Sequence, residues 1–229
     1  METKPIFLFA DSQLLFLKND QQEYYLQSVM NDITNADPSC AYIGASNNDE
    51  PVFYELFIAA MQNLGLTNCK KISSSFNEDG RDFLDKADLI LLAGGDTELG
   101  LEIFREKGID EILQRKYAEG SILIGISAGA VQLGWQSFKA VNEKMNATEA
   151  LKLLPFIVLV HQDKDELAKV AVLLQISDIK RAYEIPMGGG LIFHQDKTIE
   201  AIRKPINEFI LKEENLAHTL IFPGNHETV

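Results

Sequence analysis

Short runs of consecutive apolar residues alternate with longer amphipathic segments along most of the chain. An apolar run bounded by polar turns predicts a strand buried on both faces, and apolar residues at helical spacing predict a helix. The pattern predicts strands at residues 5–10, 40–45, 69–72, 88–92, 121–126 and 156–160. It predicts helices at residues 18–33, 51–64, 97–105 and 110–119.

This alternation predicts an α/β fold with a mainly parallel sheet and helices on both faces. The last third of the chain differs, because residues 191–193 and 198–202 flank a polar turn at residues 194–197. That arrangement predicts an antiparallel hairpin near the C-terminus, at the edge of the sheet. Since no linker rich in Pro, Gly or Ser interrupts the chain, residues 1–229 are interpreted as a single domain.

The amino-acid composition of the chain excludes some classes of binding partner. The chain carries 34 acidic and 21 basic residues, a formal charge of −13, which argues against binding to nucleic acid or to an anionic membrane. Its apolar runs, such as residues 89–93, are far shorter than a membrane helix, and the first residues lack a signal-peptide pattern. Two cysteines are too few for a disulfide framework or a zinc knuckle. We therefore expect a cytoplasmic protein.

The most informative segment is residues 125–130, GISAGA, which follow a predicted buried strand and precede an amphipathic stretch. They match Gly-x-Ser-x-Gly, the turn that holds a nucleophilic serine in a strained strand-to-helix bend. Such a bend requires small neighbours, and the amide of Ala128 would begin a helix and point at a developing oxyanion. We predict that Ser127 is a nucleophile; the alternative is an ordinary glycine-rich turn.

A serine nucleophile needs a base, and the chain has four histidines. His161 directly follows the strand predicted at residues 156–160, which places it at the carboxyl edge of the same sheet as the serine. His194 falls in the predicted hairpin turn, and His218 and His226 lie near the C-terminus. We predict that His161 is the base.

The imidazole in turn needs an acid that holds its tautomer. The acids between the nucleophile and the base are Glu143 and Glu149. Glu149 lies in residues 147–151, which predict one helical turn with a solvated glutamate, whereas Glu143 lies in a less regular stretch from which it could reach back to the histidine. Asp163 and Asp165 follow the base and are weaker candidates.

A second glycine cluster at residues 93–97, AGGDT, also follows a buried strand and opens a helix. Gly94 or Gly95 would allow close approach of a substrate and donate an amide to the oxyanion. The alternative is a phosphate-binding loop, but the spacings of the known phosphate motifs are absent. Asp96 would oppose the developing negative charge unless its carboxylate turned away or were protonated.

Residues 93–97, residues 125–130 and the Leu154-Pro155 pair ahead of His161 together resemble the dipeptidase E and cyanophycinase family of serine peptidases. The fold of that family is similar to that of class I glutamine amidotransferases, with serine in place of cysteine. The resemblance implies this fold here, with a serine nucleophile and a histidine base at the positions already predicted.

The same resemblance extends to the stretch between these motifs. With one residue inserted, Asn142-Glu143 is similar to the family's Asn-Asp pair, which implies that Glu143 is the triad acid. Lys139 falls where dipeptidase E has an arginine, which implies a contact with an acidic group of the substrate; the alternative is a solvated lysine.

The sequence therefore predicts a serine-type peptidase that hydrolyses short peptides through Ser127, His161 and Glu143. The resemblance implies a preference for N-terminal aspartate. Two alternatives stay open: an esterase with the same order of catalytic residues, and an inactive relative that binds a ligand or regulates a partner. Neither a metal nor another cofactor is implied, and the chain is expected to be a monomer or a homodimer.

Overall fold

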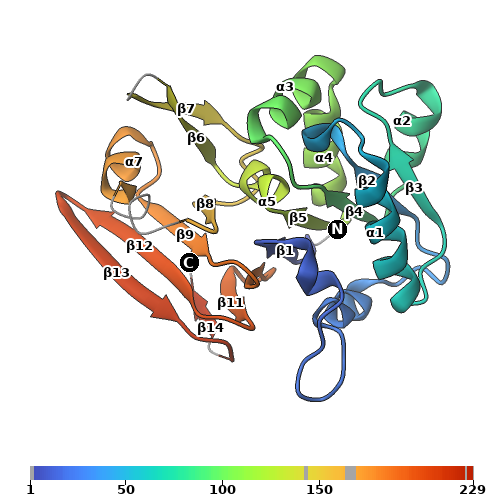
Figure 1. Ribbon diagram of the computed structural model, residues 1–229, viewed down its shortest axis with the longest axis horizontal. Helices are drawn as coiled ribbons and strands as arrows, with labels where there is room; N and C mark the ends of the chain where they lie inside the picture. The colour runs from blue at the N-terminus through green and yellow to red at the C-terminus, as the bar shows by residue number, and fades with distance from the viewer. Residues whose placement is uncertain (1–2, 142–143, 163–168, 225, 229) are drawn as a thin grey trace.

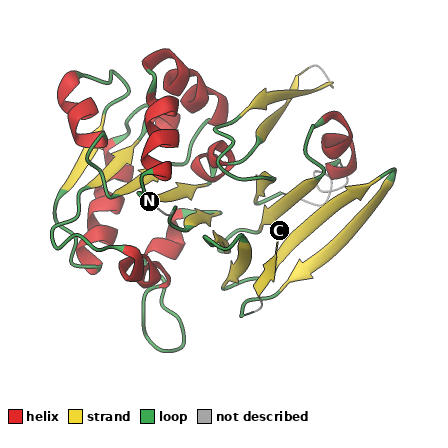
Figure 2. Ribbon diagram, turned by 180° about the vertical axis from the view of Figure 1, so that it is seen from behind, coloured by secondary structure: helices red, strands yellow, loops and turns green. Residues whose placement is uncertain are grey.

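The structure is a computed structural model that describes residues 3–141, 144–162, 169–224 and 226–228. These residues form an eight-stranded sheet with helices on both faces, a four-stranded sheet beside it, and a two-stranded hairpin (Figure 1). Figure 2 shows the helices gathered around the larger sheet, with strands dominating the other end of the molecule. The predicted α/β class is confirmed.

The eight-stranded sheet has the order β14-β11-β10-β1-β5-β4-β2-β3. Its strands are β1 (Ile6–Phe9), β2 (Cys40–Ile43), β3 (Cys69–Ile72), β4 (Leu89–Leu92), β5 (Ile122–Ile126), β10 (Gly190–Phe193), β11 (Thr198–Ile202) and β14 (His226–Thr228). The first five run parallel, and β10 and β11 add the antiparallel hairpin that the sequence predicts. The carboxyl ends of β1, β4 and β5 consequently lie side by side at one edge.

Each face of this sheet is covered by helices. One face packs against α1 (Pro51–Asn63) and the short 3-10 helices η1 (Ser12–Leu15) and η2 (Tyr25–Asp32). The opposite face packs against α2 (Glu78–Leu84), α3 (Thr97–Lys107), α4 (Ile109–Ala118) and α5 (Ala128–Leu133), and η3 (Ala45–Asn47) follows β2. Side chains alternate along a strand. Phe7 and Phe9 therefore pack on the face covered by α1, and Ile6 and Leu8 pack on the opposite face.

The four-stranded sheet has the order β13-β12-β9-β8 and is covered by α7 (Val170–Ile176). Its strands are β8 (Ile157–Val160), β9 (Arg181–Ile185), β12 (Ile206–Lys212) and β13 (Asn215–Ile221). The remaining hairpin pairs β6 (Gln136–Val141) with β7 (Lys144–Glu149).

The prediction that residues 156–160 belong to the sheet of the serine strand is wrong. Their strand, β8, runs parallel to β9 in the smaller sheet. The two sheets are joined through α5 and the chain that follows it, where the amide of Trp135 donates to the carbonyl of Phe156 at 3.0 Å. The ring of Phe156 also packs edge-on against Phe193 of the larger sheet.

Two predicted helical segments are corrected. The chain from residue 18 to 24 is a loop, because the Asn19 side chain accepts hydrogen bonds from the amides of Gln21 and Glu23, and Gln22 has a φ of 65°. Only η2 is helical in that region. Residues 147–151 are likewise not a helical turn, since their first part pairs with β6 as the end of β7.

Among the described residues, no helix has both the length and the hydrophobicity needed to cross a membrane.

Candidate active site

Ser127 lies in a sharp turn between β5 and α5. Its backbone has a φ of 51° and a ψ of −111°, a conformation that L residues adopt at a cost of about 1–3 kcal/mol. Its amide donates to the carbonyl of Phe9 at 2.8 Å, which ties the turn to the end of β1. This is the strained strand-to-helix bend that the sequence predicts.

Two glycines make this bend sterically accessible. A Cβ atom on Gly125 would lie 2.6 Å from the backbone of Ala130, and one on Gly129 would lie 2.2 Å from the carbonyl oxygen of Leu92. Helix α5 therefore packs directly on β4 and β5, and this close approach positions the serine at the edge of the sheet.

His161 follows β8 and faces the serine. Its Nε2 atom lies 3.0 Å from Ser127 Oγ, within hydrogen-bond reach. The amide of His161 donates to the carbonyl of Ile185 at 2.8 Å, and its φ is 41°. The smaller sheet thus supplies the histidine and the larger sheet supplies the serine.

The other described histidine side chains are engaged elsewhere. His194 contacts Glu200 at 2.9 Å, and His218 contacts Asn207 at 2.7 Å and stacks on Phe209. Of these three, His161 is the one placed against Ser127.

A buried acid lies beside His161. Glu184, on β9, is 2% exposed and pairs in register with Leu159 of β8. Its carboxylate accepts from Asn207 Nδ2 at 2.7 Å and from the amide of Gln162 at 3.3 Å. Burial raises the pKa of Glu184, and this rise is partly offset by those two donors and by electrostatic attraction to His161.

None of the candidate triad acids from the sequence analysis is placed beside His161 within the described residues. Glu143, Asp163 and Asp165 lie outside the described residues. Glu149 is exposed on β7 and contacts Lys152 Nζ at 2.5 Å, which lowers the pKa of its carboxyl group. The carboxylate of Glu149 is therefore committed to a surface ion pair.

The glycine loop approaches the serine closely. A Cβ atom on Gly94 would lie 3.3 Å from Ser127 Cβ. Gly95 has a φ of 141°, and a Cβ atom there would lie 2.0 Å from the carbonyl oxygen of Ser46. On the other side of the serine, the amide of Ala128 is the first in α5, so it has no acceptor within the helix. Amides from two loops are thus available beside Ser127 Oγ.

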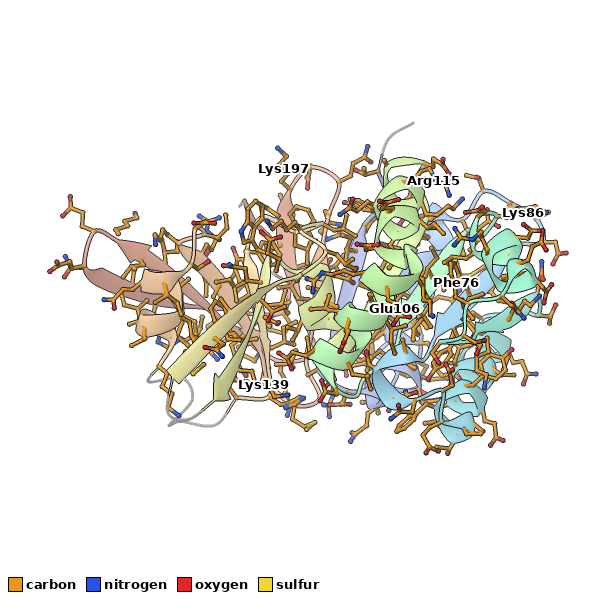
Figure 3. All side chains as sticks on the ribbon, turned by 90° about the horizontal axis from the view of Figure 1, so that it is seen from above. Phe76, Lys86, Glu106, Arg115, Lys139 and Lys197 are labelled. Atoms are coloured by element: carbon orange, nitrogen blue, oxygen red, sulfur yellow. The ribbon has the colours of Figure 1, made fainter. Side chains whose placement is uncertain are left out.

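Asp96 turns away from this point. One carboxylate oxygen accepts from the amide of Leu99 at 3.0 Å and caps α3, and the other lies 3.8 Å from Lys139 Nζ. Lys139 projects from β6, is 54% exposed and lies 3.5 Å from Glu98 as well (Figure 3). The cation near the site is therefore shared between two acids of the protein itself.

Two pockets adjoin the Ser127–His161 pair, and both residues line each of them. The first, of about 310 Å³, we call the apolar pocket; its walls include Leu15, Tyr42, Phe53, Leu56, Phe57 and Met187. The second, of about 300 Å³, we call the mixed pocket; its walls include Thr97, Glu98, Phe138, Met145, Gln162 and Lys169. Within the described ranges, no three His, Cys, Asp or Glu side chains gather as metal ligands do.

Comparisons with known proteins identify the family of the chain. Residues 7–202 match the sequence profile of peptidase family S51. The chain belongs to this family. A segment of 132 residues is 26% identical to the "Uncharacterized peptidase YgaJ" of Bacillus subtilis (strain 168), and it covers 57% of this chain and 56% of that protein. The aligned region thus spans little more than half of this curated relative.

Two solved structures share the fold. A peptidase from an acI-B1 Actinobacterium superposes with a TM-score of 0.76 at 16% identity, over 100% of this chain and 98% of the other. A putative peptidase E protein from Listeria monocytogenes EGD-e superposes with a TM-score of 0.57 at 18% identity, over 96% and 99% of the two chains. The predicted resemblance to the dipeptidase E family is confirmed.

Proposed function

We propose that this S51 family member is a serine peptidase that hydrolyses short peptides, with Ser127 as its nucleophile. The observation that carries the proposal is the 3.0 Å contact between Ser127 Oγ and His161 Nε2 at a strained turn. Nucleophile and base within hydrogen-bond reach, with the base held by a third group, are what covalent catalysis by serine requires.

The reaction proceeds in two halves. His161 takes the proton of Ser127 as Oγ attacks the peptide carbonyl, and the amides of Ala128 and of Gly94 or Gly95 stabilise the resulting oxyanion. His161 then gives that proton to the departing amine. Water, activated by the same imidazole, hydrolyses the acyl-enzyme and frees the serine.

For the third member we propose Glu184 in place of Glu143. A buried carboxylate that attracts the imidazolium holds the productive tautomer and offsets the charge formed on His161. Glu184 is 2% exposed, and its contact with the amide of Gln162 places its carboxylate next to the residue that follows His161. The amide donors around it fix its orientation.

The two pockets support short substrates. Each has about 300 Å³, near the lower limit for small-molecule sites, which suits one residue on each side of the scissile bond rather than a long chain. Lys139 remains a candidate contact for an acidic group of the substrate, in competition with Asp96 and Glu98.

A fluorophosphonate probe tests the nucleophile, because it modifies only an activated serine. We expect labelling at Ser127 in the wild-type protein, and none in S127A with an unchanged melting temperature. Peptide hydrolysis should fall by at least about 10⁴-fold in S127A.

The same assay separates the alternatives. Folded wild-type protein that resists labelling would favour the inactive relative. Rapid hydrolysis of a p-nitrophenyl ester without any peptide turnover would favour the esterase.

A further inference from the structure

The apolar pocket beside Ser127 has a composition that bears on the substrate. Its floor is formed by buried side chains, including Leu15, Tyr42 and Phe57. The rings of Tyr42 and Phe57 lie 5.5 Å apart, centroid to centroid, and form a rigid aromatic wall. Such a wall favours an apolar group that it can enclose and desolvate.

The rim of the apolar pocket is also apolar. Phe53 on α1 is 43% exposed, and Met187 in the loop after β9 is 51% exposed. Large apolar side chains left exposed around the mouth of a pocket are typical of a ligand-binding surface. Both side chains would lose contact with water when an apolar group enters.

The charges around the apolar pocket disfavour an acidic side chain. None of the described residues that line it is Lys or Arg. The charged group at its edge is Asp11, whose carboxylate accepts from the amides of Gln13 at 2.9 Å and Gly188 at 2.5 Å. A second carboxylate placed here would meet like charge, and no cationic side chain among the described lining residues offsets it. Lys204 and Arg203 donate to the carbonyls of Met187 and Gly188 in the rim loop. Lys139 pairs instead with Asp96 and Glu98.

The hydrogen bonds of Asp11 have a second effect. By binding the amide of Gly188, Asp11 holds the loop that carries Met187 against η1. The rim is therefore fixed in place, and the apolar pocket is largely preformed.

We propose that the apolar pocket binds a leucyl- or phenylalanyl-type side chain of the residue next to the scissile bond, and that this peptidase prefers apolar to aspartyl substrates. This inference rests on the proposed function, since it places the scissile bond at Ser127. It names the substrate class that the same site accepts.

Two series of dipeptides test the preference: Phe-Ala, Leu-Ala, Ala-Ala and Asp-Ala, and Ala-Phe, Ala-Leu and Ala-Asp. In the series whose variable residue enters the apolar pocket, kcat/KM for the Phe or Leu member should exceed that of the Asp member by at least about tenfold. Preference for the Asp member in either series, or discrimination below about twofold in both, would overturn the proposal.

A gain-of-function variant tests which pocket is responsible. F53R places a cation at the rim, so the ratio of aspartyl to leucyl turnover should rise at least about tenfold. V52R is the matched control, because Val52 is a neighbouring exposed residue on α1 that does not line the apolar pocket. An equal change of the ratio in F53R and V52R would contradict the assignment.

Binding to the S127A protein separates this inference from the proposed function. Isothermal titration should detect Phe-Ala or Ala-Phe binding more tightly than its aspartyl counterpart, whether or not the wild-type protein turns peptides over. If the fluorophosphonate probe labels Ser127 but aspartyl peptides bind and react best, only the pocket assignment fails. If labelling fails while apolar peptides still bind S127A preferentially, only the proposed function fails.

Discussion

The carboxylate of Glu184 is buried on β9 and accepts from the amide of Gln162, the residue that follows His161 at the end of the adjacent strand β8. Glu184 and Gln162 are 22 positions apart in the sequence, and the pairing of two neighbouring parallel strands brings them into contact. The same pairing places Glu184 near His161, the residue before Gln162. An acid placed after the histidine in the chain can serve the same role as one placed before it, because the role depends on geometry rather than on order.

Replacing Glu184 with glutamine should impair catalysis while leaving the side-chain shape nearly unchanged. Glutamine cannot offset the imidazolium charge, so we expect kcat to fall by up to about 10⁴-fold, the loss seen when the Asp of a Ser-His-Asp triad is replaced by Asn. Steady-state hydrolysis of a preferred dipeptide measures the effect, and circular dichroism checks the fold.

The matched control for Glu184 is E143Q, which removes the acid that the sequence favours. If Glu184 is the triad acid, E143Q should retain activity within about threefold. The opposite result, an inactive E143Q and an active E184Q, would restore the sequence-based assignment.

The close contact of α5 with β4 should make Gly129 intolerant of any side chain. In G129A the new methyl group would meet the Leu92 carbonyl oxygen, and we expect a loss of about 3 kcal/mol in the free energy of unfolding. Urea titration measures this loss.

G80A is the comparison for G129A, since the nearest atoms to a Cβ on Gly80 are side-chain atoms at 3.1 and 3.8 Å. Its stability should change by less than about 1 kcal/mol. Equal stability of G129A and wild type would show that α5 can move away from β4.

The pair formed by His194 and Glu200 should make stability depend on pH. Hydrogen bonding to Glu200 is the largest cause of a raised His194 pKa, so the pair stabilises the fold when the imidazole is charged. This contribution, about 1 kcal/mol, is fully present below the unfolded-state pKa of about 6.5 and is lost as pH rises through the higher folded-state pKa.

Thermal unfolding of E200Q at two pH values checks this sign. E200Q should lower the melting temperature relative to wild type at pH 5.5 and much less at pH 9. E214Q, which removes one exposed acid from the β12–β13 turn, should show no such difference between the two pH values. A larger effect of E200Q at pH 9 would contradict the prediction.

The two cysteines should differ in reactivity although they face each other on β2 and β3. The interaction between the two thiols raises the pKa of Cys40, as burial does, and lowers the pKa of Cys69. Cys40 is buried and Cys69 is half-buried. Because the thiolate is the nucleophile, iodoacetamide should modify Cys69 first. Peptide mass spectrometry measures the order; in C69S, Cys40 should stay unmodified until the protein unfolds.

Much of the site could be predicted because a local pattern encodes it. Buried strands are continuous apolar runs, and the polar residue that follows each run lies at the carboxyl edge of its sheet. That logic locates Ser127 and the Gly94-Gly95 loop at one edge of the larger sheet. It also singles out His161, which lies within reach of Ser127 although its strand belongs to the smaller sheet.

Glu184 could not be found in this way, because its position depends on which strand pairs with β8. The sequence pattern contains one signal, an acid within the otherwise apolar run of β9, AYEI, where burial of a charge would require partners. The loop at residues 18–24 was unpredictable for a different reason. There the side chain of Asn19 accepts hydrogen bonds from backbone amides and competes with helical hydrogen bonding. The spacing of apolar residues carries no information about this competition.

Ser127 belongs to one sheet, whereas His161 and Glu184 belong to the other. The proposed nucleophile is therefore activated only while the two sheets keep their mutual alignment. A displacement of about 1 Å between them would separate the serine from its base and cost about 100-fold in rate without exposing either core. Turnover should consequently decline under mild heating or low denaturant before any spectroscopic sign of unfolding. Enzyme activity would then report on the junction between the sheets more sensitively than an unfolding measurement does.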